Sequence, residues 1–100
     1  MNSNQWMSLL GLANRARKIT SGEELTIKEI KTGKAKLILL SADASQNTAK
    51  KITDKCRFYQ VPYKIVENRQ MLGAAIGKET RVVVAILDNG FAKKLKSLLD

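Results

Sequence analysis

The chain has 100 residues, a length that suits one domain with one modest hydrophobic core. Hydrophobic residues make up 44% of the sequence, which is ordinary for a globular chain and argues against intrinsic disorder. The 18 basic residues outnumber the 9 acidic ones, so the formal net charge is +9. Such a charge favours a polyanionic partner, with nucleic acid ahead of a role in solubility alone. We therefore expect a single nucleic-acid-binding domain over residues 1–100.

Residue types that support several other functions are scarce or missing. There is one cysteine, which excludes an intrachain disulfide, and no histidine, the commonest general base and metal ligand. No apolar run approaches the roughly 20 residues that span a membrane. The first six residues lack the basic and apolar parts of a signal peptide. We expect a monomeric cytoplasmic protein with no membrane partner, no cofactor, no metal and no enzymatic activity.

The first apolar residues follow a helical spacing and predict a helix over residues 3–17, capped by Ser3. Its inward stripe consists of Trp6, Leu9, Leu10 and Ala13, widened by Leu12 and Ala16. Three cations at its C-terminal end either complement the helix dipole or contact RNA phosphates: Arg15, Arg17 and Lys18. A very short strand at Ile19 and Thr20 is expected next.

The following stretch carries the pattern on which the functional interpretation depends. Ser21 and Glu24 have the spacing of a capping box, which predicts a helix over residues 22–32 that Gly33 ends. Its buried side is marked by two apolar residues, Ile27 and Ile30. Its exposed face is expected to consist of Glu24, Lys28 and Lys31.

Three further segments have the composition of strands. Residues Leu37–Ala42 and Arg81–Leu87 are continuous apolar runs, typical of strands covered on both faces. The segment Tyr63–Val66 predicts a third strand, preceded by Pro62. Because the last run is apolar throughout, we place it at the centre of the sheet.

Helices are predicted between and after these strands. A turn at 43–45 precedes a helix over 46–59, capped by Ser45. Its apolar stripe consists of Ala49, Ile52, Cys56 and Tyr59. A short helix capped by Asn68 is ended by Gly77, and a turn at Asn89–Gly90 leads into a final helix. The final helix carries Phe91, Leu95, Leu98 and Leu99.

Helices and strands thus alternate along the whole chain. This alternation predicts an α/β fold, in which one central sheet has helices on both faces.

Three patterns that could carry enzymatic chemistry have simpler explanations. The segment Gly73–Thr80 has three residues between its glycines where a phosphate loop has four, and it leads into a strand, so we interpret it as a helix stop and turn. Cys56 lies on an apolar stripe and no histidine is present to activate it, which predicts a buried structural thiol. Glu23 and Glu24 are adjacent, so their side chains diverge by about 100° on a helix.

The distribution of charge is more informative. Seven of the eighteen basic residues fall between Arg15 and Lys36, and the cations at Lys28, Lys31, Lys34 and Lys36 follow the helix that starts near Gly22. A lysine-rich face is usually only solvated, but a helix N-terminus also offers free N–H groups. Glu23 and Glu24 repel phosphate, so the N-terminus of this helix does not favour the RNA backbone. It favours the edges of bases instead, because a carboxylate can accept hydrogen bonds from their N–H groups. The pattern therefore predicts an RNA with open bases in a groove, bulge or loop.

Four segments in this order resemble one known family. They are Gly22–Lys28 with Gly33, Leu37–Ala44, Leu72–Gly77 and Arg81–Leu87. Together they are similar to the ribosomal protein L-seven-Ae superfamily, whose members bind kink-turn RNA, and in detail to its YlxQ-type bacterial branch. The resemblance covers most of the chain. It implies a three-layer α-β-α sandwich with a mixed four-stranded sheet, and a structured RNA partner, either ribosomal RNA alone or together with ribosomal proteins.

The resemblance also implies which residues meet the RNA. Gly22 and Lys28 match the motif of the family, while Glu24 stands at its Asn position and Leu25 at its Glu position. In the family these positions contact sheared G·A pairs. A second surface packs apolar residues against an extruded base, and the corresponding positions here are Thr80, Arg81, Val82 and Val83. The same surface would be lined by Ala42, Asp43 and Ser45.

Two hypotheses follow. The first is a ribosome-associated RNA-binding protein that docks a bent or bulged RNA on the loops around Gly22–Lys28 and Thr80–Val83. The second is a protein-interaction module on the same fold that has lost specific RNA binding. The departures at Glu24 and Leu25 motivate the second hypothesis, since an exposed Leu25 could anchor a protein partner.

Overall fold

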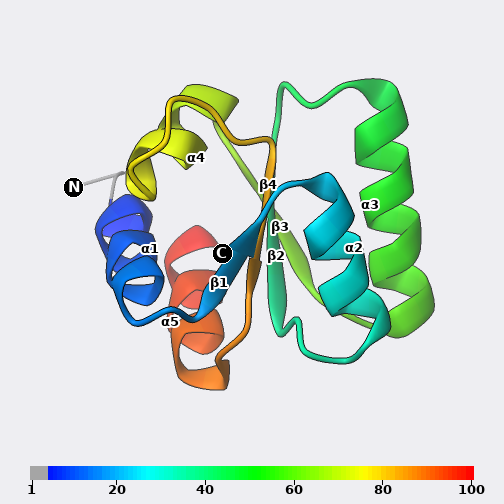
Figure 1. The fold of residues 1–100 in the computed structure, drawn as a ribbon, viewed down its shortest axis with the longest axis horizontal. Coiled ribbons are helices and arrows are strands. Elements are labelled where there is room, and N and C mark those ends of the chain that lie inside the picture. Colours follow the sequence, from blue (N-terminus) through cyan, green and yellow to red (C-terminus); the bar gives the residue numbers. More distant parts are fainter. Residues whose placement is uncertain (1–4) are drawn as a thin grey trace.

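The computed structural model describes residues 5–100, which form five helices and one four-stranded sheet (Figure 1). In chain order the elements are α1 (Gln5–Arg15), β1 (Ile19–Ser21), α2 (Glu23–Lys31), β2 (Leu37–Ser41), α3 (Gln46–Tyr59), β3 (Tyr63–Val66), α4 (Arg69–Ala75), β4 (Val83–Ile86) and α5 (Asn89–Leu99). The predicted alternation of helices and strands is confirmed.

The sheet has the strand order β1-β4-β2-β3. β4 lies between β1 and β2 and runs antiparallel to both, while β2 and β3 are parallel. Ile86 of β4 pairs with Ile19 on one side and with Leu37 on the other. The mixed sheet and the central place of the last strand are therefore as predicted.

Helices cover both faces of the sheet, with α1, α4 and α5 on one side and α2 and α3 on the other (Figure 1). Alternate residues of β2 point to opposite faces, as the pleat of a strand requires. Leu37 and Leu39 pack with the first group of helices, whereas Ile38 and Leu40 pack with the second. This two-sided burial explains why β2 and β4 are apolar at nearly every position.

The predicted N-caps of α3 and α4 are confirmed. The Ser45 hydroxyl accepts a hydrogen bond from the Thr48 N–H at 3.2 Å, and the Asn68 side chain accepts one from the Met71 N–H. Each cap contributes about 1 kcal/mol to stability. Gly33 and Gly77 follow α2 and α4 with φ of 78° and 72°, a conformation that favours glycine.

The predicted capping box at Ser21 is wrong. Ser21 is the last residue of β1, where it pairs with Val84, and its hydroxyl accepts a hydrogen bond from the Arg81 guanidinium at 3.2 Å. The N-cap of α2 is Gly22, which makes no side-chain cap. Its φ of 97° turns the chain from strand into helix within one residue, which only glycine does without strain. Strand pairing therefore overrides the local capping signal.

The predictions for the two terminal helices also need correction. α1 ends at Arg15, so Ala16 lies outside it and is exposed, and Leu12 is 51% exposed, which makes the buried stripe narrower than predicted. Ser3, the predicted cap, lies outside the described residues. Asn89 and Gly90 form the first turn of α5 rather than a separate turn, because the Asp88 carboxylate caps the Phe91 N–H at 2.9 Å.

Tyr59, which was predicted to lie on or near the apolar stripe of α3, is the last residue of that helix and is partly exposed. Leu98 of α5 is also partly exposed.

Gly73 fixes the segment that leads into β4. It lies inside α4 and is buried, and a Cβ atom at this position would stand 2.6 Å from the Cα of Thr80. The absence of a side chain therefore lets the backbone at Thr80 lie directly against α4. The predicted turn after Gly77 is confirmed, but Gly73 itself serves close packing rather than a helix stop.

We predict that Gly73→Ala lowers the free energy of unfolding by about 1–3 kcal/mol, because the methyl group overpacks a backbone contact. Equilibrium urea unfolding measures the change. Ala74→Ser is the matched control on the same helix, since Ala74 is exposed, and should stay within about 0.5 kcal/mol of the parent. Equal stability of the two variants would contradict the close approach.

Cys56 lies on the buried side of α3, as predicted. Burial raises the pKa of its thiol to about 11. Since the thiolate is the reactive form, we predict that the native protein resists thiol reagents at pH 8, whereas the urea-unfolded chain reacts at the rate of a free cysteine. Labelling with a chromogenic disulfide reagent measures both rates, and fast labelling of the native state would refute the assignment.

Candidate nucleic-acid interface

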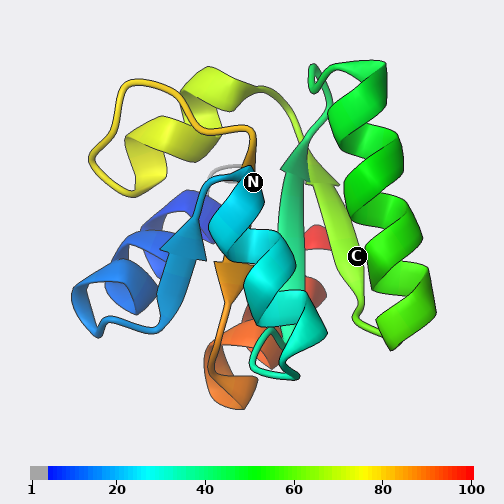
Figure 2. The same cartoon turned by 45° about the vertical axis from the view of Figure 1, so that its right-hand side comes forward.

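One edge of the sheet gathers four chain segments. Because β4 runs antiparallel to β1 and β2, its amino end lies beside the carboxyl ends of β1, β2 and β3. The starts of α2, α3 and α4 therefore meet the segment before β4 at this edge, as both ribbon views show (Figures 1 and 2). The predicted contact segments fall largely on this edge.

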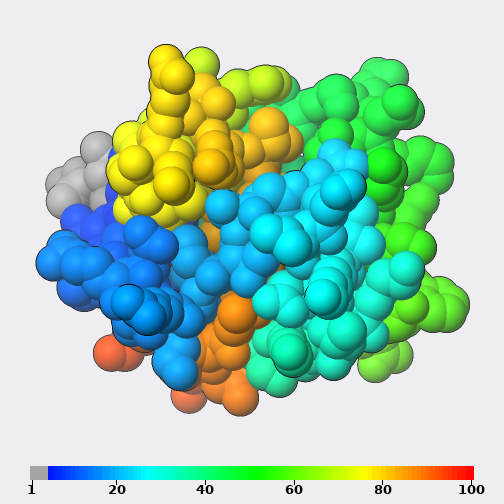
Figure 3. All heavy atoms as spheres, viewed as in Figure 1, coloured from blue at the N-terminus to red at the C-terminus, as the bar shows by residue number. Residues whose placement is uncertain are grey.

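A hydrogen bond joins the two main predicted segments. The Gly22 N–H donates to the Val83 carbonyl at 3.0 Å, which attaches the start of α2 to the start of β4. Figure 3 shows the start of α2, in blue, against the yellow-to-orange segment that precedes β4. A pocket of about 280 Å³ lies between them, lined by Gly22, Glu23, Thr48, Thr80, Arg81, Val82 and Val83. Six of these seven residues are predicted site residues, and only Thr48 is new.

Glu23 is engaged within the protein. One carboxylate oxygen accepts a hydrogen bond from the Thr48 hydroxyl at 2.8 Å, and the other pairs with the Lys51 ammonium at 2.8 Å. The hydrogen bond from Lys51, followed by that from Thr48, holds the pKa of Glu23 below its usual value. Glu23 is therefore ionised at neutral pH, and both of its oxygens already have partners.

The residues that follow Glu23 form an exposed rim beside the pocket. Glu24, Leu25 and Lys28 are all exposed, and Leu25 is exposed over 57% of its surface. Glu24, Lys28 and Lys31 share the outer face of α2, as predicted, while Ile30 is buried and Ile27 packs against the same core. The rim thus presents a carboxylate, an apolar side chain and an ammonium group.

Arg81 is held by its neighbours. Its guanidinium donates to the Ser21 hydroxyl at 3.2 Å and to the Thr80 carbonyl at 2.7 Å, and its backbone N–H donates to the Arg69 carbonyl. Val83 is buried and Val82 is half-buried, so these valines form the apolar floor of the pocket. The segment before β4 therefore presents a fixed shape.

The segment after β2 uses most of its polar groups internally. Asp43 accepts from the backbone N–H and the guanidinium of Arg69, and a second guanidinium nitrogen donates to the Asp43 carbonyl at 2.6 Å. The Ser45 hydroxyl caps α3, while Ala42 is exposed. The segment lies beside the pocket, since the Ser41 N–H donates to the Val82 carbonyl at 2.8 Å.

The remaining predicted cations lie at the opposite end of α2. Lys31 ends the helix, and Lys34 and Lys36 follow it, about 13 Å along the helix axis from its start. The Lys36 ammonium donates to the Gly33 carbonyl at 3.3 Å. The fold therefore does not bring these three lysines to the pocket, and they extend the positive surface along α2.

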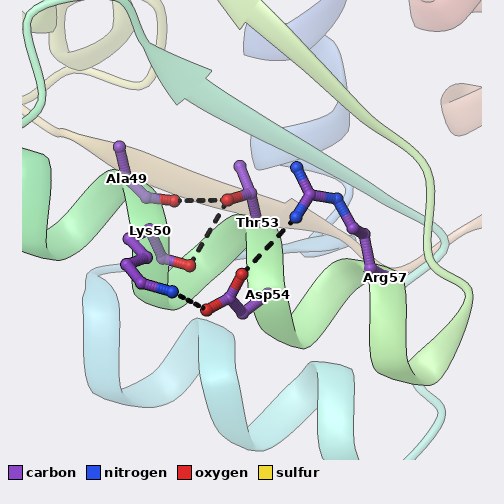
Figure 4. Close-up of polar contacts among 5 residues, drawn as sticks. All are labelled: Ala49, Lys50, Thr53, Asp54 and Arg57. Atoms are coloured by element: carbon purple, nitrogen blue, oxygen red, sulfur yellow. Dashed lines mark hydrogen bonds and ion pairs between the residues drawn. The ribbon is translucent and has the colours of Figure 1, made fainter.

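Cations of different helices differ in their pairing. On α3, Asp54 binds both Lys50 and Arg57, and the Thr53 hydroxyl returns to the carbonyls of its own helix (Figure 4). By contrast, twelve cations form no ion pair with any residue among 5–100. Seven of the twelve lie between Arg15 and Lys36: Arg15, Arg17, Lys18, Lys28, Lys31, Lys34 and Lys36. More than half of the unpaired cations thus fall on α2, in the segment after it, and at the end of α1 and just beyond it.

Three contributors were missed from the sequence. Thr48 and Lys51 reach Glu23 from α3 across 25 and 28 residues, and Arg69 reaches Asp43 across 26. No local spacing rule links residues that far apart, so the signal for these pairs lies in the packing of α2 on α3 and of α4 beside the β2–α3 turn.

The described part of the chain contains neither a cluster of metal-binding side chains nor a helix that could span a membrane. Within residues 5–100, no group of three or more cysteine, aspartate or glutamate side chains is close enough to hold a metal ion. None of the helices in this range is long and apolar enough to cross a bilayer.

Relatives of the chain are found in bacteria and archaea. A Bacillus subtilis protein named RNA-binding protein YlxQ is 66% identical over 100 residues, which cover all of both chains. An Enterococcus faecium protein of the same name is 46% identical over 99 residues, covering 99% of this chain and 95% of the relative. Large ribosomal subunit protein eL8 of Thermoplasma volcanium is 29% identical over 94 residues, covering 93% and 78%.

Solved structures give the same fold. A protein of unknown function from Bacillus halodurans superposes with a TM-score of 0.94 and 53% identity, covering 96% of this chain and 97% of its own. The Giardia lamblia 15.5kD RNA binding protein superposes with a TM-score of 0.81 and 21% identity, covering 93% and 80%, a likeness in fold. Residues 4–96 match the model of the ribosomal protein L7Ae/L30e/S12e/Gadd45 family. The chain therefore belongs to this family, within its YlxQ-type bacterial branch.

Proposed function

We propose that the chain binds structured RNA at the edge where the start of α2 meets the segment before β4, and that it does so as a ribosome-associated protein in the cytoplasm. The observation that carries this proposal is the pocket between Gly22 and Val83, beside a helix whose lysines, Lys28 and Lys31, form no ion pair with any residue among 5–100. Relatives named as RNA-binding and as a ribosomal subunit protein support the same class of partner.

The chemistry of the pocket suits an unstacked base. Val82 and Val83 offer an apolar floor, and Arg81 supplies a positive charge whose position is already fixed. Bases that leave the stack in loops and bulges are recognised by apolar contact and by hydrogen bonds to their edges. Glu24, which is exposed at the rim, accepts hydrogen bonds from donors such as those of guanine.

The finer proposal is a kink-turn or a similarly bulged RNA. It is supported by membership of the family and by the way the fold joins the two segments that the resemblance assigned to RNA contact. Lys28 projects from the outer face of α2 one turn beyond Glu24, where it can meet the backbone of an RNA held at the pocket. Lys31, Lys34 and Lys36 then add attraction that is independent of sequence.

Lys28→Ala should weaken RNA binding and lower the slope of log affinity against log salt by about 1, because one phosphate contact is lost. Fluorescence anisotropy with a labelled RNA at several salt concentrations measures both quantities. Lys94→Ala is the matched control, since Lys94 is an exposed cation on α5, on the other face of the sheet. A slope that is unchanged in Lys28→Ala, or reduced equally in the control, would remove Lys28 from the interface.

We expect the protein to prefer a kink-turn RNA over a plain duplex of equal length, and to keep this preference at raised salt, because base contacts are screened less than phosphate contacts. Parallel titrations at two salt concentrations provide the test. Equal binding that vanishes with salt would leave electrostatic attraction alone. In that case the exposed Leu25 favours the second candidate, a protein partner that covers this side chain.

A further inference from the structure

Two adjacent carboxylates at the start of α2 conflict with a polyanionic ligand. Glu24 is exposed and Glu23 lines the pocket, so both would repel phosphate unless their charge is compensated. The structure compensates one of them. We propose that Lys51 of α3 is a positioning residue that neutralises Glu23, and that it makes the pocket acceptable to RNA without itself contacting the RNA. This role rests on the proposed function and deepens it.

The Lys51 ammonium is already bound to Glu23 within the protein. Its ammonium lies 2.8 Å from one Glu23 oxygen, and the Thr48 hydroxyl donates to the other at 2.8 Å. Both oxygens are thus occupied from α3, and the carboxylate is turned toward that helix. The ion pair carries no net charge as a whole, and it holds the ionised carboxylate as an oriented part of the pocket wall.

The pair differs from the other ion pairs on the same helix. Lys50 pairs with Asp54 four residues later, on the exposed side of α3, and links no second element (Figure 4). Lys51 pairs across 28 residues and joins two helices at the edge where they both begin. Truncating Lys51 therefore leaves an unpaired charge in the pocket, whereas truncating Lys50 leaves Asp54, on the exposed side of α3, still paired with Arg57.

Other charged groups near Glu23 do not replace Lys51. Arg81 lines the same pocket, but its guanidinium donates to Ser21 and to the Thr80 carbonyl. Glu24, the next residue, carries the same sign of charge and cannot compensate Glu23. Lys51 is therefore the cation whose loss changes the charge state of the pocket wall.

The experiment is a double-mutant cycle read by RNA affinity, using the full chain and a labelled kink-turn RNA at low salt. The variants are Lys51→Ala, Glu23→Gln, both together, and Lys50→Ala as the matched control. Lys51→Ala should weaken binding about threefold to fivefold, the range expected for one exposed charge pair. Glu23→Gln alone should bind at least as tightly as the parent. Thermal melts of every variant confirm that the compared proteins are folded.

Rescue is the decisive result. If Lys51 neutralises Glu23, the double variant has the same pocket charge as the parent and should regain its affinity, while Lys50→Ala stays near the parent throughout. If Lys51 contacts RNA directly, the double variant remains as weak as Lys51→Ala, which overturns the proposal. A loss of affinity in Glu23→Gln alone, or no loss in Lys51→Ala, also overturns it.

RNA binding by the parent protein distinguishes failure of the role proposed for Lys51 from failure of the proposed function. If it binds the RNA but the cycle shows no coupling between positions 23 and 51, only the role of Lys51 is wrong. If the parent binds neither kink-turn nor duplex RNA, the proposed function fails, and the role of Lys51 toward RNA fails with it.

Discussion

The position of β4 determines where the interface lies. A strand that is last in the chain but central in the sheet must cross from α4 back between β1 and β2, and it enters antiparallel to both. Its first residue therefore meets the place where β1 turns into α2, and the Gly22 N–H bonds to the Val83 carbonyl there. Two segments some sixty residues apart in sequence become one surface because of this single crossing.

Glycine makes two of these contacts possible, for different reasons. Gly22 adopts a positive φ, so the chain changes from strand to helix within one residue and α2 starts at the sheet edge. Gly73 has an ordinary helical role but no room for a Cβ, so α4 and the backbone at Thr80 come into contact. Together they fix the two ends of the pocket wall before any ligand arrives.

Much of the fold could be predicted from the sequence because the relevant signals are local. Ser45 and Asn68 cap the helices that follow them, and the apolar runs of β2 and β4 revealed strands buried on both faces. The capping box failed because a distant partner competes with a local rule: Ser21 has the spacing of a cap, yet pairing with Val84 keeps it extended. The start of α5 was misplaced although its cap is local, because the Asp88 carboxylate caps the helix one residue before the predicted turn at Asn89.

In the candidate site, too, local features could be predicted from the sequence, whereas contacts between residues far apart in the chain could not. The outer face of α2 followed from helical spacing, and the two contact segments followed from a family resemblance whose geometry the fold supports. The engagement of Glu23 by Thr48 and Lys51, and of Asp43 by Arg69, could not be read from spacing, since each pair spans 25 residues or more. Those contacts decide which charges remain available to a partner, so they matter more to function than to fold.

The site consequently combines a fixed part with an adaptable part. The pocket wall is held by hydrogen bonds at Glu23 and Arg81 and by the packing of Thr80 on α4, whereas Glu24, Leu25 and Lys28 project freely from α2. A preformed wall lowers the entropy that binding costs, while long free side chains adjust to the backbone of an incoming strand. In the proposed complex with RNA, the wall would select the shape of the ligand, and the cations on α2 and after it would attract the RNA.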